Sequence, residues 1–297
     1  MKRSLGEKVF NICNITIMLI ICVVTLYPFL NQLAIAFNDG MDSMSGGLMI
    51  IPRVFTLDNF KAVFKNSDFY NSVILSVTIT IIHTATALLV TYMAAYGLTR
   101  KGVPYKRGIT LFLMIPAYIH AGMIPAYINM KNLHLINNYM VYILPILFTF
   151  YNMVIIRSFL QELPPSIEES ARVDGAGEFR IMFQIIMPLS VPVIATVCLW
   201  LAVAAWNNWT TTLYYVTDKK LFTVQYFMMK LIKEAEAVLQ MAQQLSMDTS
   251  SADRITEVTS DSIKSAALIV TTIPIVCVYP FLQKYFIKGV TLGGVKE

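Results

Sequence analysis

Residues 69–98 read FYNSVILSVTITIIHTATALLVTYMAAYGL, a run without a single aspartate, glutamate, lysine or arginine. The hydrocarbon core of a bilayer is about 30 Å thick, and roughly 20 helical residues cross it. A helix is expected because a lone strand would leave its backbone groups unpaired in lipid. This stretch therefore predicts a membrane-spanning helix.

Five further windows are uncharged and long enough to pass the same test: residues 9–37, 108–128, 136–156, 187–216 and 265–283. The composition agrees, since 14% of the residues are charged, against about 25% in an average soluble protein. This excludes a soluble globular enzyme, a disordered chain and a nucleic-acid-binding domain. We predict an all-α polytopic membrane protein with six transmembrane helices, forming a single transmembrane domain over residues 1–297.

The first window also has features of a signal peptide. Ala34-Ile35-Ala36 resembles a signal-peptidase site, and Lys2, Arg3 and Lys8 would form the basic region before it. However, the uncharged run from Val9 to Asn38 is far longer than the apolar region of a signal peptide, which has about 7–15 residues. A retained first helix is the favoured interpretation.

The distribution of basic residues predicts the orientation. If both termini are cytoplasmic, the inner segments hold 13 of the 23 lysines and arginines, and with the acidic residues their net charge is +6. The outer segments then have a net charge of −1, and six of their ten basic residues lie in Thr217–Lys264, where charge has little influence on orientation. We therefore predict two cytoplasmic termini and outer loops at residues 38–68 and 217–264.

The outer loops contain signals for local structure. A turn is expected at Gly46-Gly47, a short helix along the membrane from about Thr56 to Phe60, and partial helix between Leu221 and Leu245.

The sequence predicts no metal site and no catalytic group. The four cysteines, at positions 13, 22, 198 and 277, lie in apolar runs without paired spacing, so we interpret them as small buried hydrophobes. His83 and His120 are isolated within predicted spans and are interpreted as packing partners.

The inner segment at residues 158–187 carries the most patterned polar sequence, LPPSIEESARVDG at residues 163–175. Two prolines end the preceding helix. Ser166 followed by Glu169 predicts a capping box, and Gly175 is expected to end the new helix after about two turns.

A second helix is expected to follow. Phe179, Met182, Phe183 and Ile186 form one apolar stripe at helical spacing before Pro188 opens the fifth window. A compact pair of helices like this suits a groove in a partner protein. The alternative is an amphipathic loop that rests on the bilayer.

These residues resemble the EAA motif of ABC importer permeases, which pass substrates delivered by an extracytoplasmic binding protein. The motif is Glu-Ala-Ala, three residues, Gly, nine residues, Ile, one residue, Leu-Pro. Here it is matched by Glu169-Ser170-Ala171, Gly175, Ile185 and Met187-Pro188, with Ser170 and Met187 as mild departures. The position of the motif between the fourth and fifth windows also matches.

Other segments narrow the resemblance to the carbohydrate branch, and within it to the second subunit of maltose permeases. They are Asp174-Gly175-Ala176, Trp206-Asn207-Asn208-Trp209 and residues 279–289. The outer segment with Tyr215-Val216-Thr217-Asp218 resembles a subgroup that imports oligosaccharides from degraded polysaccharides, some of them rich in uronate.

The resemblance implies a set of partners. The chain has no Gly-x-x-x-x-Gly-Lys-Ser/Thr phosphate loop, so ATP and Mg²⁺ are expected on a separate pair of ATPase subunits and no cofactor on this chain. A second permease subunit, a solute-binding protein, an oligosaccharide and membrane lipid complete the set, in a bacterial cytoplasmic (inner) membrane. The residues expected to couple this chain to the ATPase are Ser166, Glu169, Ser170, Ala171, Asp174, Gly175, Ile185 and Pro188.

The candidate residues for the substrate path are aromatic or carry amides, the groups that hold sugars. They are Trp206, Asn207, Asn208, Trp209 and Tyr214, in the fifth window. The tryptophans could equally form an interfacial belt or pack between helices. The asparagines should face a partner helix or an aqueous path, because a polar side chain facing lipid is costly.

Three other classes of membrane protein are alternatives to an ABC importer permease. An ion-coupled secondary transporter commonly places ionisable residues in its spans, and the six windows contain no Asp, Glu, Lys or Arg. An intramembrane enzyme would need a catalytic constellation, but neither His83 nor His120 has a carboxylate at helical spacing. A channel would leave the patterned inner segment unexplained.

Overall fold

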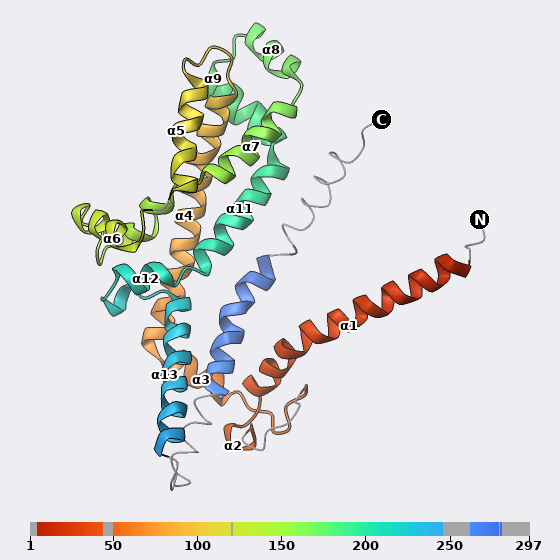
Figure 1. Cartoon of the computed structure of the whole chain (residues 1–297), viewed down its shortest axis with the longest axis vertical. Coiled ribbons are helices and arrows are strands. Elements are labelled where there is room, and N and C mark those ends of the chain that lie inside the picture. The colour runs from red at the N-terminus through yellow and green to blue at the C-terminus, as the bar shows by residue number, and fades with distance from the viewer. Residues whose placement is uncertain (1–4, 44–49, 120, 246–261, 279, 281–297) are drawn as a thin grey trace. The chain divides into compact units, whose positions relative to one another are not determined.

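A computed structural model describes residues 5–43, 50–119, 121–245, 262–278 and 280 (Figure 1). Over these ranges the chain is helical apart from turns, extended connections and one isolated bridge between Asn38 and Phe55. The chain divides into two units, one of residues 1–70 and 228–273, the other of residues 71–227 and 274–297. The prediction of a single domain is not tested by this division and stays a prediction.

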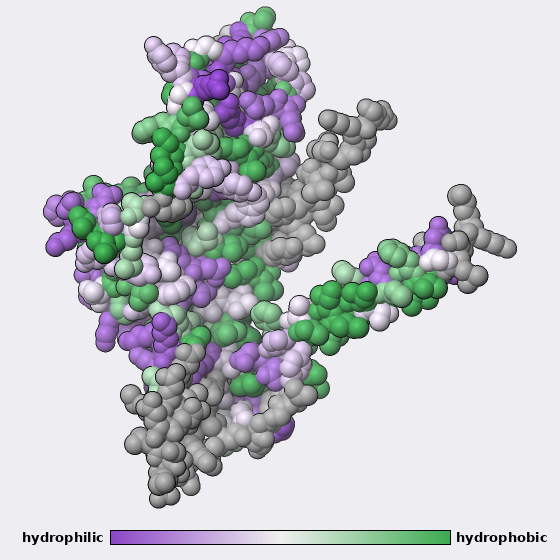
Figure 2. Space-filling view, in the orientation of Figure 1, coloured by the Kyte–Doolittle hydropathy of each residue, from purple (hydrophilic) through white to green (hydrophobic). Residues whose placement is uncertain are grey.

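The first unit contains the first uncharged window, which forms the helix α1, Leu5–Ala36. Apolar side chains are exposed along α1 (Figure 2), while Ala34 and Ala36 at its end are buried. Such a helix is long enough to cross a bilayer. The other helices that lie wholly or mainly in this unit are α2, Gly40–Ser43, α3, Asp58–Lys65, α13, Val224–Leu245, and the helix Ser262–Val278.

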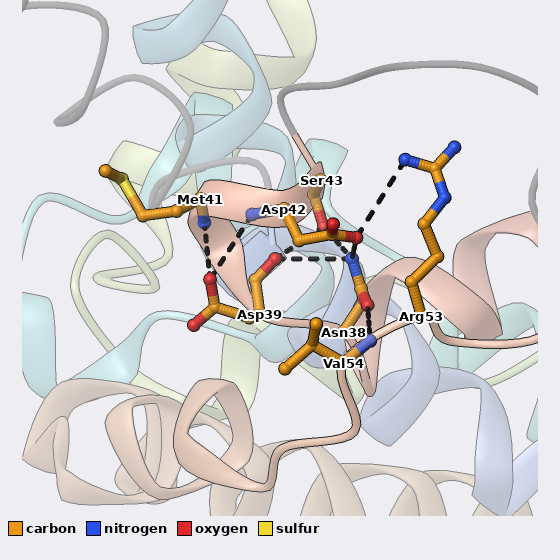
Figure 3. Close-up of polar contacts among 7 residues, drawn as sticks. All are labelled: Asn38, Asp39, Met41, Asp42, Ser43, Arg53 and Val54. Carbon is orange, nitrogen blue, oxygen red and sulfur yellow. Dashed lines mark hydrogen bonds and ion pairs between the residues drawn. The ribbon is translucent and has the colours of Figure 1, made fainter.

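The loop after α1 is closed by the side chain of Asn38, which is fully buried (Figure 3). Its Nδ2 donates to Asp42 Oδ2 and to Ser43 Oγ, each at 2.9 Å. Its Oδ1 accepts the backbone N–H of Val54 at 2.8 Å. One amide thus joins the beginning and the end of the loop.

A second buried amide attaches α3 to the end of α1. Asn59 Nδ2 donates to the carbonyl oxygens of Ala36 at 3.0 Å and Asn38 at 2.8 Å. The structure confirms helices at both predicted places, α3 and α13, while their positions along the membrane and in outer loops stay predictions. The expected Gly46-Gly47 turn lies outside the described residues.

The second unit is built around α4, Ser67–Thr99, which matches the predicted span at residues 69–98. Its remaining elements, in chain order, are α5, Lys106–Tyr118; α6, Met123–Asn132; η1, Tyr139–Tyr142; η2, Leu144–Ile146; α7, Phe150–Glu162; α8, Pro165–Val173; α9, Glu178–Arg180; η3, Ile181–Ile186; α10, Met187–Leu189; α11, Val191–Trp206; α12, Thr210–Tyr215; and η4, Lys219–Leu221.

The third, fourth and fifth windows are not the straight spans that the sequence predicted. The pairs α5 with α6, η1–η2 with α7, and α9–α10 with α11 are bent by 115°, 50° and 84°. Each break has a proline close to it, at Pro116, Pro145 and Pro188, and a proline removes a helical hydrogen bond and clashes with the preceding turn.

The described helices therefore support fewer uninterrupted spans than predicted. Two are long and apolar enough alone, and up to five are if each bent pair counts as one span. Ser262–Val278 is a shorter apolar helix in the sixth window, whose residues 279 and 281–283 lie outside the described part. The count of six and the orientation of the termini stay predictions.

The main core of the second unit gathers side chains from α4, α7, α8, η3 and α11. Tyr92, Ile156, Ile181 and Val197 are among its most buried members. α7 lies against both α5 and α11 (Figure 1), so these helices hold one another around that core.

A smaller cluster lies around Tyr142, whose hydroxyl hydrogen-bonds Thr212 Oγ1 at 2.8 Å and donates to the carbonyl of Leu221 at 2.6 Å. The buried His83 places Nε2 3.2 Å from the carbonyl oxygen of Ile146. This contact fits the packing role predicted for that histidine.

Replacing Asn59 with alanine should leave two carbonyl oxygens without their amide donor. We expect Asn59→Ala to lower the free energy of unfolding by about 1–3 kcal/mol. Denaturant titration of the purified subunit in detergent measures this change. Lys61→Ala on the same helix is the control, because it removes only an exposed ion pair with Asp58 and should cost about 0.5 kcal/mol or less. Equal effects of the two substitutions would contradict the assigned role of Asn59.

Candidate functional site

The helix α8 lies where the sequence predicted a helix, at one end of the second unit (Figure 1). The predicted capping box is wrong, because α8 begins at Pro165 and no side chain caps it. Proline suits the first helical position, since its fixed φ matches the helix and its missing N–H would be unpaired there anyway. Ser166 is thus already inside the first turn.

The end of α8 is as predicted. Gly175 has φ +79°, a left-handed conformation that glycine adopts without strain. Its N–H donates to the carbonyl of Arg172 at 3.0 Å, and the N–H of Ala176 donates to the carbonyl of Ala171 at 2.9 Å. These two bonds form a Schellman motif, which ends the helix and turns the chain.

The segment after the turn differs from the predicted amphipathic α-helix. After one turn of α9 it continues as the π-helix η3, and its buried residues are Ile181, Met182 and Ile186. A π-helix has hydrogen bonds from i to i+5, so its faces do not follow the spacing of an α-helix. Of the predicted stripe, Met182 and Ile186 are buried, whereas Phe183 within η3 is 37% exposed and Phe179, in the turn of α9 before it, is 70% exposed.

The two faces of α8 have different surroundings. Ser166, Glu169, Ser170 and Val173 are exposed, and Val173 is 87% exposed. Ala171 is buried in the core of the second unit. The small side chain of Ala171 thus allows close approach to the chain's own helices.

The remaining coupling candidates follow the same division. Asp174 and Gly175 are exposed at the turn, and Pro188 is exposed at the start of α10. Ile185 is half-buried and packs against the core.

An ion pair joins the inner face of α8 to the end of α4. Both terminal nitrogens of the Arg100 guanidinium donate to the two carboxylate oxygens of Glu168. The Arg100 and Glu168 side chains are only 17% and 24% exposed. The Arg100 guanidinium carbon also lies 4.1 Å from the centre of the Tyr96 ring, a cation–π contact.

Two further contacts extend this ion pair into a connected set of side chains, which the backbone of α8 between Glu168 and Arg172 completes as a ring. The Tyr96 hydroxyl donates to Glu178 Oε2 at 3.2 Å, and Arg172 Nη2 lies 2.5 Å from Glu178 Oε1. We call these five residues, Tyr96, Arg100, Glu168, Arg172 and Glu178, the inner ring. It connects α4, α8 and α9.

The guanidinium of Arg100 stays charged within the inner ring. Partial burial disfavours the charged guanidinium of Arg100, but the hydrogen bond and charge of Glu168, together with Tyr96 and Glu178, outweigh it and raise the pKa of Arg100. Arg100 is thus a permanent cation.

The inner ring was not predicted from the sequence, where the lysines and arginines served only to predict the orientation of the chain in the membrane. One signal was available. Glu168 and the small Ala171 are three residues apart, so they share a helix face, whereas Glu169 lies about 100° around the helix.

The candidates for the substrate path lie at the break between α11 and α12. Trp206 is buried as the last residue of α11, and Asn207 follows it as the C-cap. Asn208 Oδ1 accepts the backbone N–H of Thr211 at 3.1 Å, so this amide caps α12. Asparagine favours such positions because its side chain competes with the helix for backbone groups.

Asn207 and Tyr214 are the open members of this set. Asn207 is exposed, and its Oδ1 accepts Gln225 Nε2 at 3.3 Å. Tyr214 is 44% exposed and lies edge-on to Tyr215, which stacks on Tyr127 with 6.2 Å between ring centres. Aromatic rings and an amide thus gather at this break.

Among the described residues, no group of three or more His, Cys, Asp or Glu side chains could hold a metal ion. His120 and the motif residues at 279 and 281–289 lie outside the described part.

Comparison with known proteins gives the geometry its context. Residues 87–292 match the model of a family described as binding-protein-dependent transport system inner membrane component. Over 290 residues the chain is 31% identical to the polygalacturonan/rhamnogalacturonan transport system permease protein YtcP of Bacillus subtilis, covering 98% of this chain and 99% of YtcP. It is 34% identical to the protein LplC of the same organism, covering 100% of this chain and 98% of LplC.

A solved structure shows the same fold. It is described as a bacterial ABC transporter involved in the import of the acidic polysaccharide alginate, and it matches with a TM-score of 0.84 at 22% identity, over 96% of this chain and 99% of that chain. The resemblance found in the EAA motif is thereby confirmed. The chain belongs to the family of inner-membrane components of binding-protein-dependent transport systems.

Proposed function

We propose that this chain is one of two permease subunits of an ATP-driven importer of acidic oligosaccharides. The observation that carries the proposal is the exposed outer face of α8, in a chain that belongs to a binding-protein-dependent transport family. In this proposal a separate pair of ATPase subunits binds ATP and Mg²⁺ and moves α8, which we call the coupling helix. The membrane is the bacterial cytoplasmic membrane, with both termini inside.

The chemistry of α8 supports a protein partner on its outer face. Val173 and Phe179 expose apolar side chains beside the exposed carboxylate of Glu169. The end of the unit that carries α8 and α9 is otherwise largely hydrophilic (Figure 2), unlike the apolar surfaces that face lipid. Exposed apolar side chains within a polar surface are typical of sites where another protein binds.

The coupling step depends on the packing of α8 against the core of the second unit. Closure of the two ATPase subunits would displace α8, and the packing of Ala171 would pass that displacement to the transmembrane helices. The path would then switch between inward-facing and outward-facing states by a rigid-body movement. Ser166, Glu169, Ser170, Asp174 and Gly175 are the residues that we assign to the ATPase contact and its turn.

The substrate class follows from the relatives. Polygalacturonan is a polymer of uronate sugars, and alginate is described as acidic. No lysine or arginine lies in the six predicted windows. This chain would therefore hold the sugar through the accessible aromatic and amide groups Asn207, Trp209 and Tyr214, while the buried Trp206 packs and Asn208 shapes the break.

Uptake by the assembled complex tests the function. The two permease subunits, the ATPase pair and the binding protein are placed in liposomes with labelled oligosaccharides. We expect ATP-dependent uptake of oligogalacturonides about tenfold above uptake of neutral arabino-oligosaccharides of equal length.

Two other results would change the proposal in different ways. Preference for the neutral sugar would refute the acidic substrate and leave the importer intact. Uptake that continues without ATP, but with a proton gradient, would favour the ion-coupled transporter instead.

The turn at Gly175 gives a second prediction. No atom lies within 4 Å of a Cβ added there, so only the backbone conformation limits the side chain. A left-handed φ costs an ordinary residue about 1–2 kcal/mol, and a β-branched one is especially unfavourable. We expect Gly175→Val to lower ATP-driven uptake about fivefold or more, with normal amounts in the membrane.

Two controls isolate the backbone effect. Gly175→Asn should retain most uptake, because asparagine tolerates left-handed backbone. Gly177→Ala should retain it too, since Gly177 has φ −73° and open space around it. Wild-type uptake by Gly175→Val would show that this turn does not matter for coupling.

The outer face of α8 gives a third prediction. A charge at Val173 would have to be desolvated in an interface, so Val173→Asp should reduce co-purification of the ATPase subunits about tenfold. Val173→Ile keeps the position apolar and should bind the ATPase normally. Equal retention of the ATPase by both variants would place the docking surface elsewhere.

A further inference from the structure

Arg100 lies at the junction between the end of α4 and the inner face of α8. We propose that Arg100 is a positioning residue, whose guanidinium holds the coupling helix to α4 so that displacement of α8 is delivered to that long helix. This inference rests on the proposed function, since it assigns Arg100 a part in ATPase-driven transport.

The geometry of the ion pair suits a rigid joint. The guanidinium is a planar fork that meets the Glu168 carboxylate with two parallel hydrogen bonds, which fix orientation as well as distance. The low exposure of both side chains limits screening by water and salt. An exposed pair of single contacts would give neither property.

The inner ring holds α8 at two points. Glu168 and Arg172 are four residues apart on α8, about one helical turn. Glu168 is bound by Arg100, and Arg172 pairs with Glu178, which in turn accepts a hydrogen bond from Tyr96. Tyr96 lies in the last turn of α4, and Arg100 directly follows that helix. The covered pair with Glu168 is the main point of attachment, and the pair of Arg172 and Glu178, each 51% exposed, supplements it against rotation of α8 about its axis.

The alternative role of Arg100 is to orient the chain in the membrane. A charge with that role only needs to stay hydrated beside the bilayer, as the exposed neighbour Lys101 does. Arg100 is instead largely covered, stacked on Tyr96 and paired with a residue 68 positions away in the sequence. This placement favours a mechanical role over an orienting one.

A double-mutant cycle on the complete complex in liposomes tests the inference. Arg100→Gln, Glu168→Gln and the double variant are compared by the number of sugar molecules taken up per ATP hydrolysed. We expect each single variant to lower this ratio about fivefold, and the double variant to be no worse than the worse single one, because the two residues act through each other. Lys101→Gln is the matched control and should stay within about twofold of wild type.

Co-purification separates transmission from docking. The Arg100→Gln complex should retain its ATPase subunits, because Arg100 contacts the inner face of α8 and not its exposed face. Loss of the ATPase, a wild-type ratio in Arg100→Gln, or a double variant whose loss equals the product of the single losses would each overturn the inference.

A conservative variant covers the case in which Arg100→Gln does not accumulate in the membrane. Arg100→Lys keeps the charge but not the fork, so its ratio should fall about threefold. A wild-type ratio in Arg100→Lys would overturn the assigned geometry. Absence of any uptake by the wild-type complex would refute the proposed function itself, whereas uptake unaffected at Arg100 would refute only the positioning role.

Discussion

Backbone groups that enter hydrocarbon must find their hydrogen bonds within the protein, and the rest of the structure depends on this constraint. It explains why the uncharged windows form helices and why polar side chains satisfy backbone groups at two of the interruptions. At the break after α11, the Asn208 side chain accepts the N–H of Thr211 at the start of α12. The backbone carbonyl of Asn208 accepts the hydroxyl of Thr223 at 3.2 Å. At the start of η1, the Asn138 side chain accepts the N–H of Met140. Polar side chains in these windows thus make the bent elements possible.

The sequence predicts those features that depend mainly on one physical effect, such as the absence of charge or the conformational freedom of glycine. Absence of charge over thirty residues leaves no competitor to a spanning helix, so α1 and α4 were predicted nearly to their ends. A glycine after a short amphipathic helix leaves few alternatives to a left-handed turn, and Gly175 adopts one. The breaks in the third and fourth windows were missed because hydropathy is insensitive to the local effect of single prolines such as Pro116 and Pro145, whereas Pro188 was already expected to open the fifth window.

At the coupling helix, the sequence again predicted local features and missed the contacts between distant segments. The outer residues of α8 were predicted because a fixed spacing marks them in the chain. The inner ring brings together Tyr96 and Arg100 from α4 with Glu168 from α8, and no spacing within one segment encodes contacts between distant segments. Ala171 was expected among the ATPase-coupling residues, whereas in the structure its small side chain is buried in the chain's own core.

The π-helix η3 connects these observations. An extra residue in its turns moves Ile181 and Ile186, five positions apart, onto the same buried side. In a regular α-helix the stripe from Phe179 to Ile186 would instead turn both phenylalanines toward the core. Phe183 within η3 is 37% exposed, and Phe179, in the turn of α9 that precedes η3, is 70% exposed at the end of the unit that carries α8 (Figure 1). Because π-turns are costly and cluster at functional sites, a segment that uses one to expose an aromatic ring is consistent with selection for a partner at this surface rather than for packing alone.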